Sequence, residues 1–361
     1  MTPLFLCKYL ETSDADKKEV NEMKLIRTID AVGHVLCHDM TQIIPGVKKD
    51  AAFRKGHIVT EEDIPVLLSM GKENLYVWEK TAGMLHEDEA AIRLYSICKN
   101  DYMEGTEIKE GKISLKATRD GVLKVDTKRL NTVNAAGEII IAARHGGFPV
   151  KKGDILASAR VIPLVIEEEK LKKAEEEVKD KPLLELLPFG KKKAYIITTG
   201  NEVYTGRIKD AFGPVIRKKL AEYGVEVLGQ TILGDAPDKI AETIQEAVKQ
   251  GADMICCTGG MSVDPDDTTP SAIKNTGAEL VAYGAPVLPG AMFLLAYYQG
   301  NIPIMGLPGC VMYNKRTIFD LVLPRLIAGE RLKKEDLTML GEGGLCLGCK
   351  ECHFPNCGFG K

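Results

Sequence analysis

The sequence has almost no excess of either charge: 48 Lys and Arg residues stand against 51 Asp and Glu, a formal net charge of −3 at pH 7. Proteins that bind nucleic acid present a basic face, so this balance argues against nucleic acid and anionic membranes as partners. No apolar run approaches the ~20 residues that cross a bilayer. The first residues, MTPLFLCKYLETSDADKK, lack the basic leader of a signal peptide. We therefore expect a cytoplasmic protein.

Cysteine is not scarce, with 10 residues in a chain of 361. In a reducing compartment, clustered thiols indicate metal or redox chemistry more often than disulfides. The last 30 residues carry a C-x2-C-x2-C-x4-C pattern made by Cys346, Cys349, Cys352 and Cys357. Such spacing suits a [4Fe-4S] cluster of the ferredoxin kind. Zinc is the alternative, held by four thiolates or with His353 replacing one of them.

The tail is also rich in glycine, and its GGLCLGCKECHFPNCGFGK stretch shows no apolar pattern. We therefore expect residues 346–357 to have no core of their own and to be ordered by a metal.

Composition divides the chain into successive zones. We expect an N-terminal tail (1–20), a small α+β domain (21–105), a β-rich domain (106–166), a charged helical linker (167–190), an α/β domain (191–330) and a Cys-rich metal-binding tail (331–361). Within the β-rich zone, Asp120-Gly121 between two alternating runs predicts a hairpin. The linker EEEKLKKAEEEVKDKP predicts a solvated helix with a thin apolar stripe of Leu171, Ala174 and Val178.

From residue 191 onward, short apolar runs alternate with amphipathic stretches. AYIIT, VEVLGQTIL, DMICC and IPIMGLPG are typical of buried strands, and GPVIRKKLAEYG and DAPDKIAETIQEAVKQG of helices, the second with Asp235 as its cap. This alternation predicts an α/β fold, a three-layer doubly wound, mostly parallel sheet preceded by smaller β-rich domains.

Three of these strands end in small or glycine residues: TTGNE (198–202), TGG (258–260) and LPG (307–309). In an open α/β sheet, ligands bind outside the carboxyl ends of the strands. The three segments are therefore expected to converge on one pocket, where a ligand can approach the backbone.

The loop TGGMSVDPDDTTP (258–270) contains no Lys or Arg but carries Asp264, Asp266 and Asp267, and Asp210 precedes another predicted helix. These carboxylates would repel a phosphate unless a divalent cation lay between them, and Mg²⁺ binds in that way. Asp267 could instead cap the following helix, because Asp-Thr-Thr-Pro is a typical helix start. For Asp266, a solvated loop acid is the favoured interpretation.

TTGNEVYTGRIKDAFGPVI, TGGMSVDPDDTTP and GLPGCVMY together resemble the three signature segments of the molybdopterin-binding domain of the MoaB/Mog type. This domain occurs in molybdopterin adenylyltransferases and molybdopterin molybdenumtransferases, and the resemblance covers residues 191–330. It implies that molybdopterin or its adenylate is the ligand, that Asp210 and Asp267 are paired aspartates for Mg²⁺, and that Glu202 orients a ligand. The implied cofactor-binding residues are Thr199, Gly200, Asn201, Gly259, Gly260, Met261, Ser262, Asp264, Pro308 and Gly309.

The resemblance implies a role in molybdenum cofactor biosynthesis, with a β-rich extension typical of the transferase that inserts molybdate. The N-terminal half lacks the DNSAMDGYA-like segment of that transferase, and DPDDTTP is closer to the adenylyltransferase pattern. A non-catalytic carrier or sensor of molybdopterin, with a redox-active or zinc-binding tail, is therefore the alternative. The resemblance also implies a homodimer, and a molybdoenzyme is a possible partner.

Overall fold

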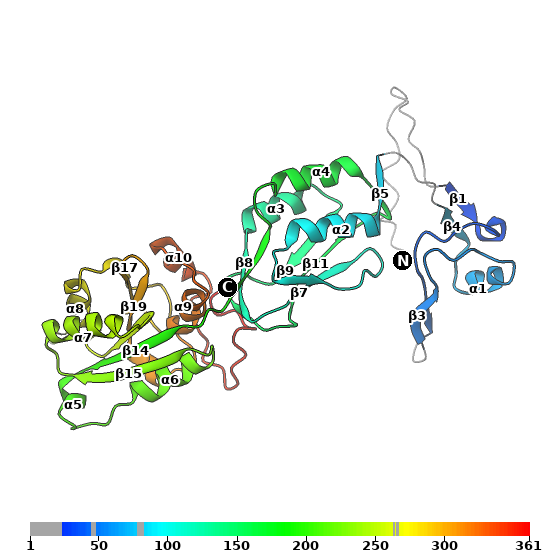
Figure 1. Ribbon diagram of the computed structural model, residues 1–361. Coiled ribbons are helices and arrows are strands. Elements are labelled where there is room, and N and C mark those ends of the chain that lie inside the picture. Colours follow the sequence, from blue (N-terminus) through cyan, green and yellow to red (C-terminus); the bar gives the residue numbers. More distant parts are fainter. Residues whose placement is uncertain (1–23, 45–47, 78–82, 263, 265–266) are drawn as a thin grey trace.

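The computed structural model describes residues 24–44, 48–77, 83–262, 264 and 267–361. Figure 1 shows three parts that follow one another in chain order, from a small N-terminal part through a middle part to an α/β domain. The C-terminal residues lie where the middle part and the α/β domain meet, because Lys361 lies over the ring of Phe148 and Gly360 lies beside Leu321.

The N-terminal part is built from two small antiparallel pairs, β1 with β4 and β2 with β3. Its elements are β1 (Lys24–Arg27), η1 (Thr28–Asp30), β2 (Met40–Ile44), β3 (Lys48–Phe53), α1 (Asp63–Ser69) and β4 (Asn74–Val77). At the start of α1, Asp63 accepts hydrogen bonds from the backbone and hydroxyl of Thr60, and the chain turns at Gly71 after the helix. Leu36, Leu67 and Leu75 are among the residues of its small core.

The middle part has one hydrophobic core under several small sheets, which join in the orders β6-β7-β11-β9, β10-β8-β13 and β12-β5. Its strands are β5 (Met84–His86), β6 (Met103–Gly105), β7 (Ile113–Ala117), β8 (Gly121–Val125), β9 (Ile139–Ala143), β10 (Pro149–Val150), β11 (Ile155–Val161), β12 (Val165–Glu167) and β13 (Leu184–Pro188). Its helices are α2 (Glu87–Cys98), α3 (Thr127–Ala135) and α4 (Glu168–Glu177). This core spans residues on both sides of 105/106 and 166/167, the divisions that composition suggested.

The hairpin predicted at Asp120-Gly121 is wrong. β7 pairs with β6 and β11, whereas β8 pairs with β10 and β13 in another sheet. Gly121 serves a close approach between strands, because a Cβ atom there would lie 2.3 Å from the carbonyl oxygen of Leu187 in β13. The Asp120 carboxylate accepts a hydrogen bond from the backbone N–H of Lys152 and forms an ion pair with Lys151.

The charged helix is present as α4, and its thin apolar stripe is buried. Leu171, Ala174 and Val178 all belong to the core of the middle part. Arg93 of α2 holds the outer side of α4 through ion pairs with Glu168 and Glu175. The helix is therefore packed along the middle part, and β13 then leads into the α/β domain.

The α/β domain contains a six-stranded sheet in the order β15-β14-β16-β19-β18-β17. Its strands are β14 (Lys193–Thr199), β15 (Glu226–Leu233), β16 (Met254–Thr258), β17 (Glu279–Tyr283), β18 (Leu294–Tyr298) and β19 (Ile302–Leu307). Its helices are α5 (Asn201–Tyr204), α6 (Phe212–Ala221), α7 (Pro237–Lys249), α8 (Thr269–Asn275), η2 (Gly309–Met312) and α9 (Ile318–Ile327), followed by α10 (Lys334–Thr338) and η3 (Met339–Gly341). β14, β15, β16 and β19 are parallel, whereas β18 runs antiparallel to both neighbours. The predicted three-layer, mostly parallel fold is confirmed.

Alternate residues of the central strands point to opposite faces of this sheet. Ile196 and Cys256 belong to a core with α6 and α9, whereas Ile197 and Cys257 belong to a second core with α7 and α8. Helices on both faces leave the carboxyl ends of β14, β16 and β19 at one edge. One helix start differs from its prediction: α7 has Ala236 at its N-cap, and Asp235 accepts a hydrogen bond from the backbone N–H of Asn201.

Candidate functional site: a pocket at the sheet edge and a cysteine-lined cavity

A pocket of about 420 Å³ lies at the carboxyl ends of β16 and β19. Two of the three predicted segments line it, through Gly259, Gly260, Met261 and Ser262 after β16 and Pro308 and Gly309 after β19. The register explains why they meet, since Thr258 at the end of β16 is paired with Leu307 at the end of β19. The remaining lining residues are Phe212, Asp267, Ala291, Met292, Cys310 and Tyr313.

The glycine pair is required by the first predicted segment, which lies directly beneath it. Gly259 has a φ of +84°, and a Cβ atom there would lie 2.1 Å from the carbonyl oxygen of Thr199. At Gly260, where φ is +54°, a Cβ atom would lie 2.9 Å from the Thr269 hydroxyl. The Thr199 and Thr269 hydroxyls are hydrogen-bonded at 3.0 Å. The TTGNE segment, through Thr199, thus packs directly against the glycine loop.

Tyr283 at the end of β17 fixes the loop from its other side. Its hydroxyl donates to the carbonyl oxygens of Met261 at 2.9 Å and Ser262 at 3.1 Å. Burial, followed by the nearby Asp267 carboxylate, raises the pKa of Tyr283. The phenol is therefore kept protonated and able to donate, and it holds the loop in a shape that leaves the glycine backbone facing the pocket.

Among the described acids of this loop, Asp267 lines the pocket. Its Oδ2 accepts from the backbone N–H of Asp264 at 2.9 Å, and its own N–H donates to the Asp264 carbonyl oxygen at 2.9 Å. The side chain thus closes a turn within the loop, and α8 takes Thr268 as its N-cap residue. Asp264 is exposed, and Asp266 lies outside the described residues.

Asp210 and Glu202 are not among the residues that line the pocket. The Asp210 carboxylate accepts from the backbone N–H groups of Phe212 and Gly213 and, at 2.7 Å, from the Gln230 side chain. It therefore holds the first turn of α6, and Phe212 rather than Asp210 reaches the pocket lining. Glu202 is exposed on α5, and Thr199, Gly200 and Asn201 are not among the residues that line the pocket.

Sequence reasoning missed an apolar side of the pocket, formed by Phe212, Met292 and Tyr313. Tyr313 belongs to the GLPGCVMY segment but was not singled out. Met292 lies before β18, an antiparallel strand that the alternation of strands and helices did not predict. Phe212 follows Asp210 directly, so it could have been found by asking which residue of that turn is apolar.

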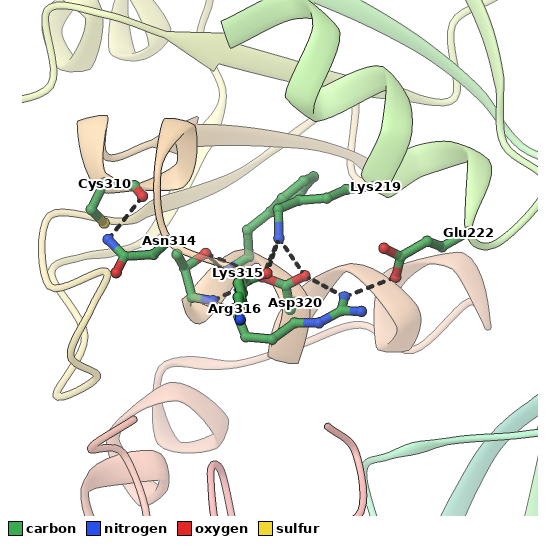
Figure 2. A network of polar contacts seen from close by, with 9 residues as sticks. Lys219, Glu222, Cys310, Asn314, Lys315, Arg316 and Asp320 are labelled. Carbon is green, nitrogen blue, oxygen red and sulfur yellow. Dashed lines mark hydrogen bonds and ion pairs between the residues drawn. The ribbon is translucent and has the colours of Figure 1, made fainter. Parts of the chain in front are cut away.

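A buried ion network holds the chain that follows the pocket (Figure 2). The Lys219 ammonium of α6 donates to both carboxylate oxygens of Asp320 in α9, at 2.7 and 2.8 Å, and to the carbonyl oxygen of Lys315 at 2.9 Å. Arg316 bridges Asp320 and Glu222, each at 2.8 Å. The segment 310–316 is thereby fixed between α6 and α9, and we call it the wall segment.

The predicted cysteine set lies beside the wall segment. Most residues of the stretch 345–359 and residues 313–316 of the wall segment line a second cavity of about 520 Å³, and Tyr313 lines both cavities. The four predicted ligands, Cys346, Cys349, Cys352 and Cys357, all line it. Cys256 and Cys257 are instead fully buried in β16, as expected for core cysteines, and burial raises the pKa of Cys256 to about 12.

The tail packs against the core of the α/β domain rather than forming a core of its own. Phe359 is 4% exposed and belongs to the core shared with α6 and α9, and Phe354 packs against Phe148 and Phe359. The backbone of Cys346 donates to Leu288, and Leu288 donates to Gly344. Phe354 and Phe359, which lie on either side of Cys357, thus dock the tail, and the dominance of Gly and Cys in its composition concealed this.

The described residues contain neither a membrane-spanning helix nor a compact group of metal ligands. None of the described helices is long and apolar enough to cross a membrane. Within the same residues, no group of three or more His, Cys, Asp or Glu side chains is arranged to hold one metal ion. The tail thiols surround their cavity without converging on one point.

Residues 195–328 match the family model described as a probable molybdopterin-binding domain. This stretch contains the six-stranded sheet apart from the first residues of β14, together with the pocket. Residues 195–328 are therefore similar to a probable molybdopterin-binding domain. Residues 25–79, the N-terminal part, match a model described as a domain of unknown function.

Among individual proteins, the chain is similar to a CinA-like protein of Mycobacterium avium, 42% identical over 90 residues, which is 25% of this chain and 21% of that protein. A CinA-like protein of Mycobacterium tuberculosis is 41% identical over the same length. The chain thus spans about a fifth of the length of these curated relatives. The molybdopterin biosynthesis enzyme MoaB of Thermus thermophilus matches 39% of this chain and 99% of its own, with 23% identity and a TM-score of 0.32.

Proposed function

We propose that the 420 Å³ pocket binds molybdopterin or its adenylate, and that the protein acts in molybdenum cofactor biosynthesis. The observation that carries this proposal is the composition of the pocket within a probable molybdopterin-binding domain. Its two sides differ: a glycine loop supplies backbone N–H groups that suit a phosphate, and Phe212, Met292 and Tyr313 suit a flat ring system.

Asp267 gives the acid-lined loop its role in this proposal. Its carboxylate lies at the pocket with the glycine pair, and Mg²⁺ typically binds through one or two carboxylates together with ligand phosphates. Mg²⁺ held there would neutralise the repulsion between Asp267 and a phosphate. Asp210, whose oxygens accept three N–H groups, would support the ligand indirectly by placing Phe212.

For the reaction, we propose that the protein promotes molybdate insertion into adenylated molybdopterin with release of AMP. Asp267→Asn keeps the size of the side chain and its ability to accept the Asp264 N–H, and it removes the charge. Turnover should fall at least tenfold in this variant while the fold is retained. Asp238→Asn is the matched control, because Asp238 is exposed on the first turn of α7.

The experiment is incubation with adenylated molybdopterin, molybdate and Mg²⁺, followed by measurement of AMP. Activity of Asp267→Asn within about twofold of wild type would refute the role of Asp267. Glu202 lies outside the pocket and Asp210 is engaged by backbone N–H groups, which favours a second candidate, a non-catalytic carrier of the cofactor. Tight ligand binding without AMP release in the wild type would select that candidate.

A further inference from the structure

The cavity beside the wall segment brings together four thiols from the tail. Cys349 and Cys352 are exposed, Cys346 and Cys357 are half-buried, and none of the four is in a disulfide. All four face one cavity of about 520 Å³. A C-x2-C-x2-C-x4-C pattern and a shared cavity are independent observations, and both concern the same four side chains.

The size of the cavity distinguishes between a single ion and a cluster. Zinc needs its four sulfur ligands about 2.3 Å from one point, which requires the thiols to converge. Among the described residues no three His, Cys, Asp or Glu side chains are gathered around one point, and the four cysteines instead line a cavity of about 520 Å³. A cluster of several iron and sulfide atoms holds its thiolates farther apart and occupies the space between them.

The charge around the cavity also suits a cluster. Four thiolates bring a net negative charge to a cluster, and the cavity is lined by the cations Lys315, Arg316 and Lys350. These cations are held in place: Lys315 donates to the carbonyl oxygen of Lys350 at 2.6 Å, and Arg316 lies 5.1 Å from the ring centroid of Phe354. The positive side chains that line the cavity thus complement the negative charge that four thiolates would bring.

From these observations we propose that Cys346, Cys349, Cys352 and Cys357 bind a [4Fe-4S] cluster in this cavity beside the wall segment. Tyr313 lines both cavities, so the proposed cluster and the pocket would share this side chain. This site goes beyond the proposed cofactor-binding function and does not depend on it.

The test is anaerobic purification of the full chain, reconstitution with iron and sulfide under a thiol reductant, and measurement of iron, acid-labile sulfide and zinc. We expect about four iron and four sulfide per chain with broad visible absorption. About one zinc per chain without sulfide, or no metal after reconstitution, would overturn the proposal. No pterin enters this assay, so its outcome is independent of the proposed function.

Variants identify the ligands. Cys349→Ser and Cys352→Ser should each lose at least half of the bound iron, and both positions are exposed, so circular dichroism should show an unchanged fold. Cys310→Ser is the control, because Cys310 belongs to the wall segment but does not line the cysteine cavity. Full iron retention in Cys349→Ser and Cys352→Ser, or iron loss in Cys310→Ser alone, would contradict the assigned ligand set.

Discussion

Replacing Lys219 by Met should destabilise the α/β domain by about 3 kcal/mol, the lower end of the range for removing one partner of a buried ion pair. Lys219 and Asp320 are 5% and 2% exposed, and the ammonium donates to both Asp320 oxygens and to Lys315. The cost stays at the lower end because Asp320 keeps two partners, the Arg316 guanidinium and the backbone N–H of Thr317.

The assay is urea unfolding followed by circular dichroism, with the slope of the transition checked for constancy. Lys218→Met is the matched control, since Lys218 is the exposed neighbour on the same helix, and its effect should stay within about 0.5 kcal/mol. Combining Lys219→Met with Asp320→Asn should give a coupling energy above about 1 kcal/mol. A loss below about 1 kcal/mol for Lys219→Met, or additive effects in the double variant, would refute the reasoning.

Three further predictions concern the pocket and the tail. Gly259→Ala should lower the free energy of unfolding in urea by about 2 kcal/mol or more, because of its positive φ and its close approach to Thr199. Gly251→Ala is the control, with a φ of +94° and open space around it, and should lower this free energy by about 1 kcal/mol. Equal losses in the two variants would contradict the close approach. Tyr283→Phe should cost about 1 kcal/mol and weaken molybdopterin binding several-fold in calorimetry, because the loop loses two hydrogen bonds, and unchanged affinity would count against this role. Cluster loading should block the rapid reaction of Cys349 and Cys352 with a thiol reagent, and continued reaction would argue against ligation.

The α/β fold was predictable because its signals are local. Most of its parallel strands are short apolar runs, and its helices carry stop signals such as Gly224 and Gly251, which both have positive φ. The carboxyl ends of parallel strands must share one edge, so Gly259 and Pro308 could be assigned to one pocket from order alone.

What sequence could not predict depends on contacts between distant segments. β8 pairs with β13 rather than with β7, and no local pattern at Asp120-Gly121 records that choice. Lys219 and Asp320 are 101 residues apart, so the network that fixes the wall segment has no sequence signature. The same holds for Phe359, whose burial depends on a surface made by α9 and the middle part.

The paired-aspartate assignment shows a different limit. A motif gives residue types, but Asp210 directs its carboxylate to the start of α6, whereas Asp267 lies at the pocket. For both acids, the spacing from the neighbouring glycine segment is compatible with a carboxylate at a helix start and with a carboxylate at the pocket. The contacts of Asp210 with the backbone N–H groups of Phe212 and Gly213 show that Asp267, and not Asp210, lines the pocket.

The most direct test of the central claim is calorimetric titration of molybdopterin into the wild type and Asp267→Asn, each with and without Mg²⁺. If Asp267 holds Mg²⁺ against the ligand phosphate, Mg²⁺ should raise the affinity of the wild type at least tenfold and leave that of Asp267→Asn unchanged. Equal wild-type affinity with and without Mg²⁺, or the same Mg²⁺ gain in both proteins, would contradict the account of the acid-lined loop.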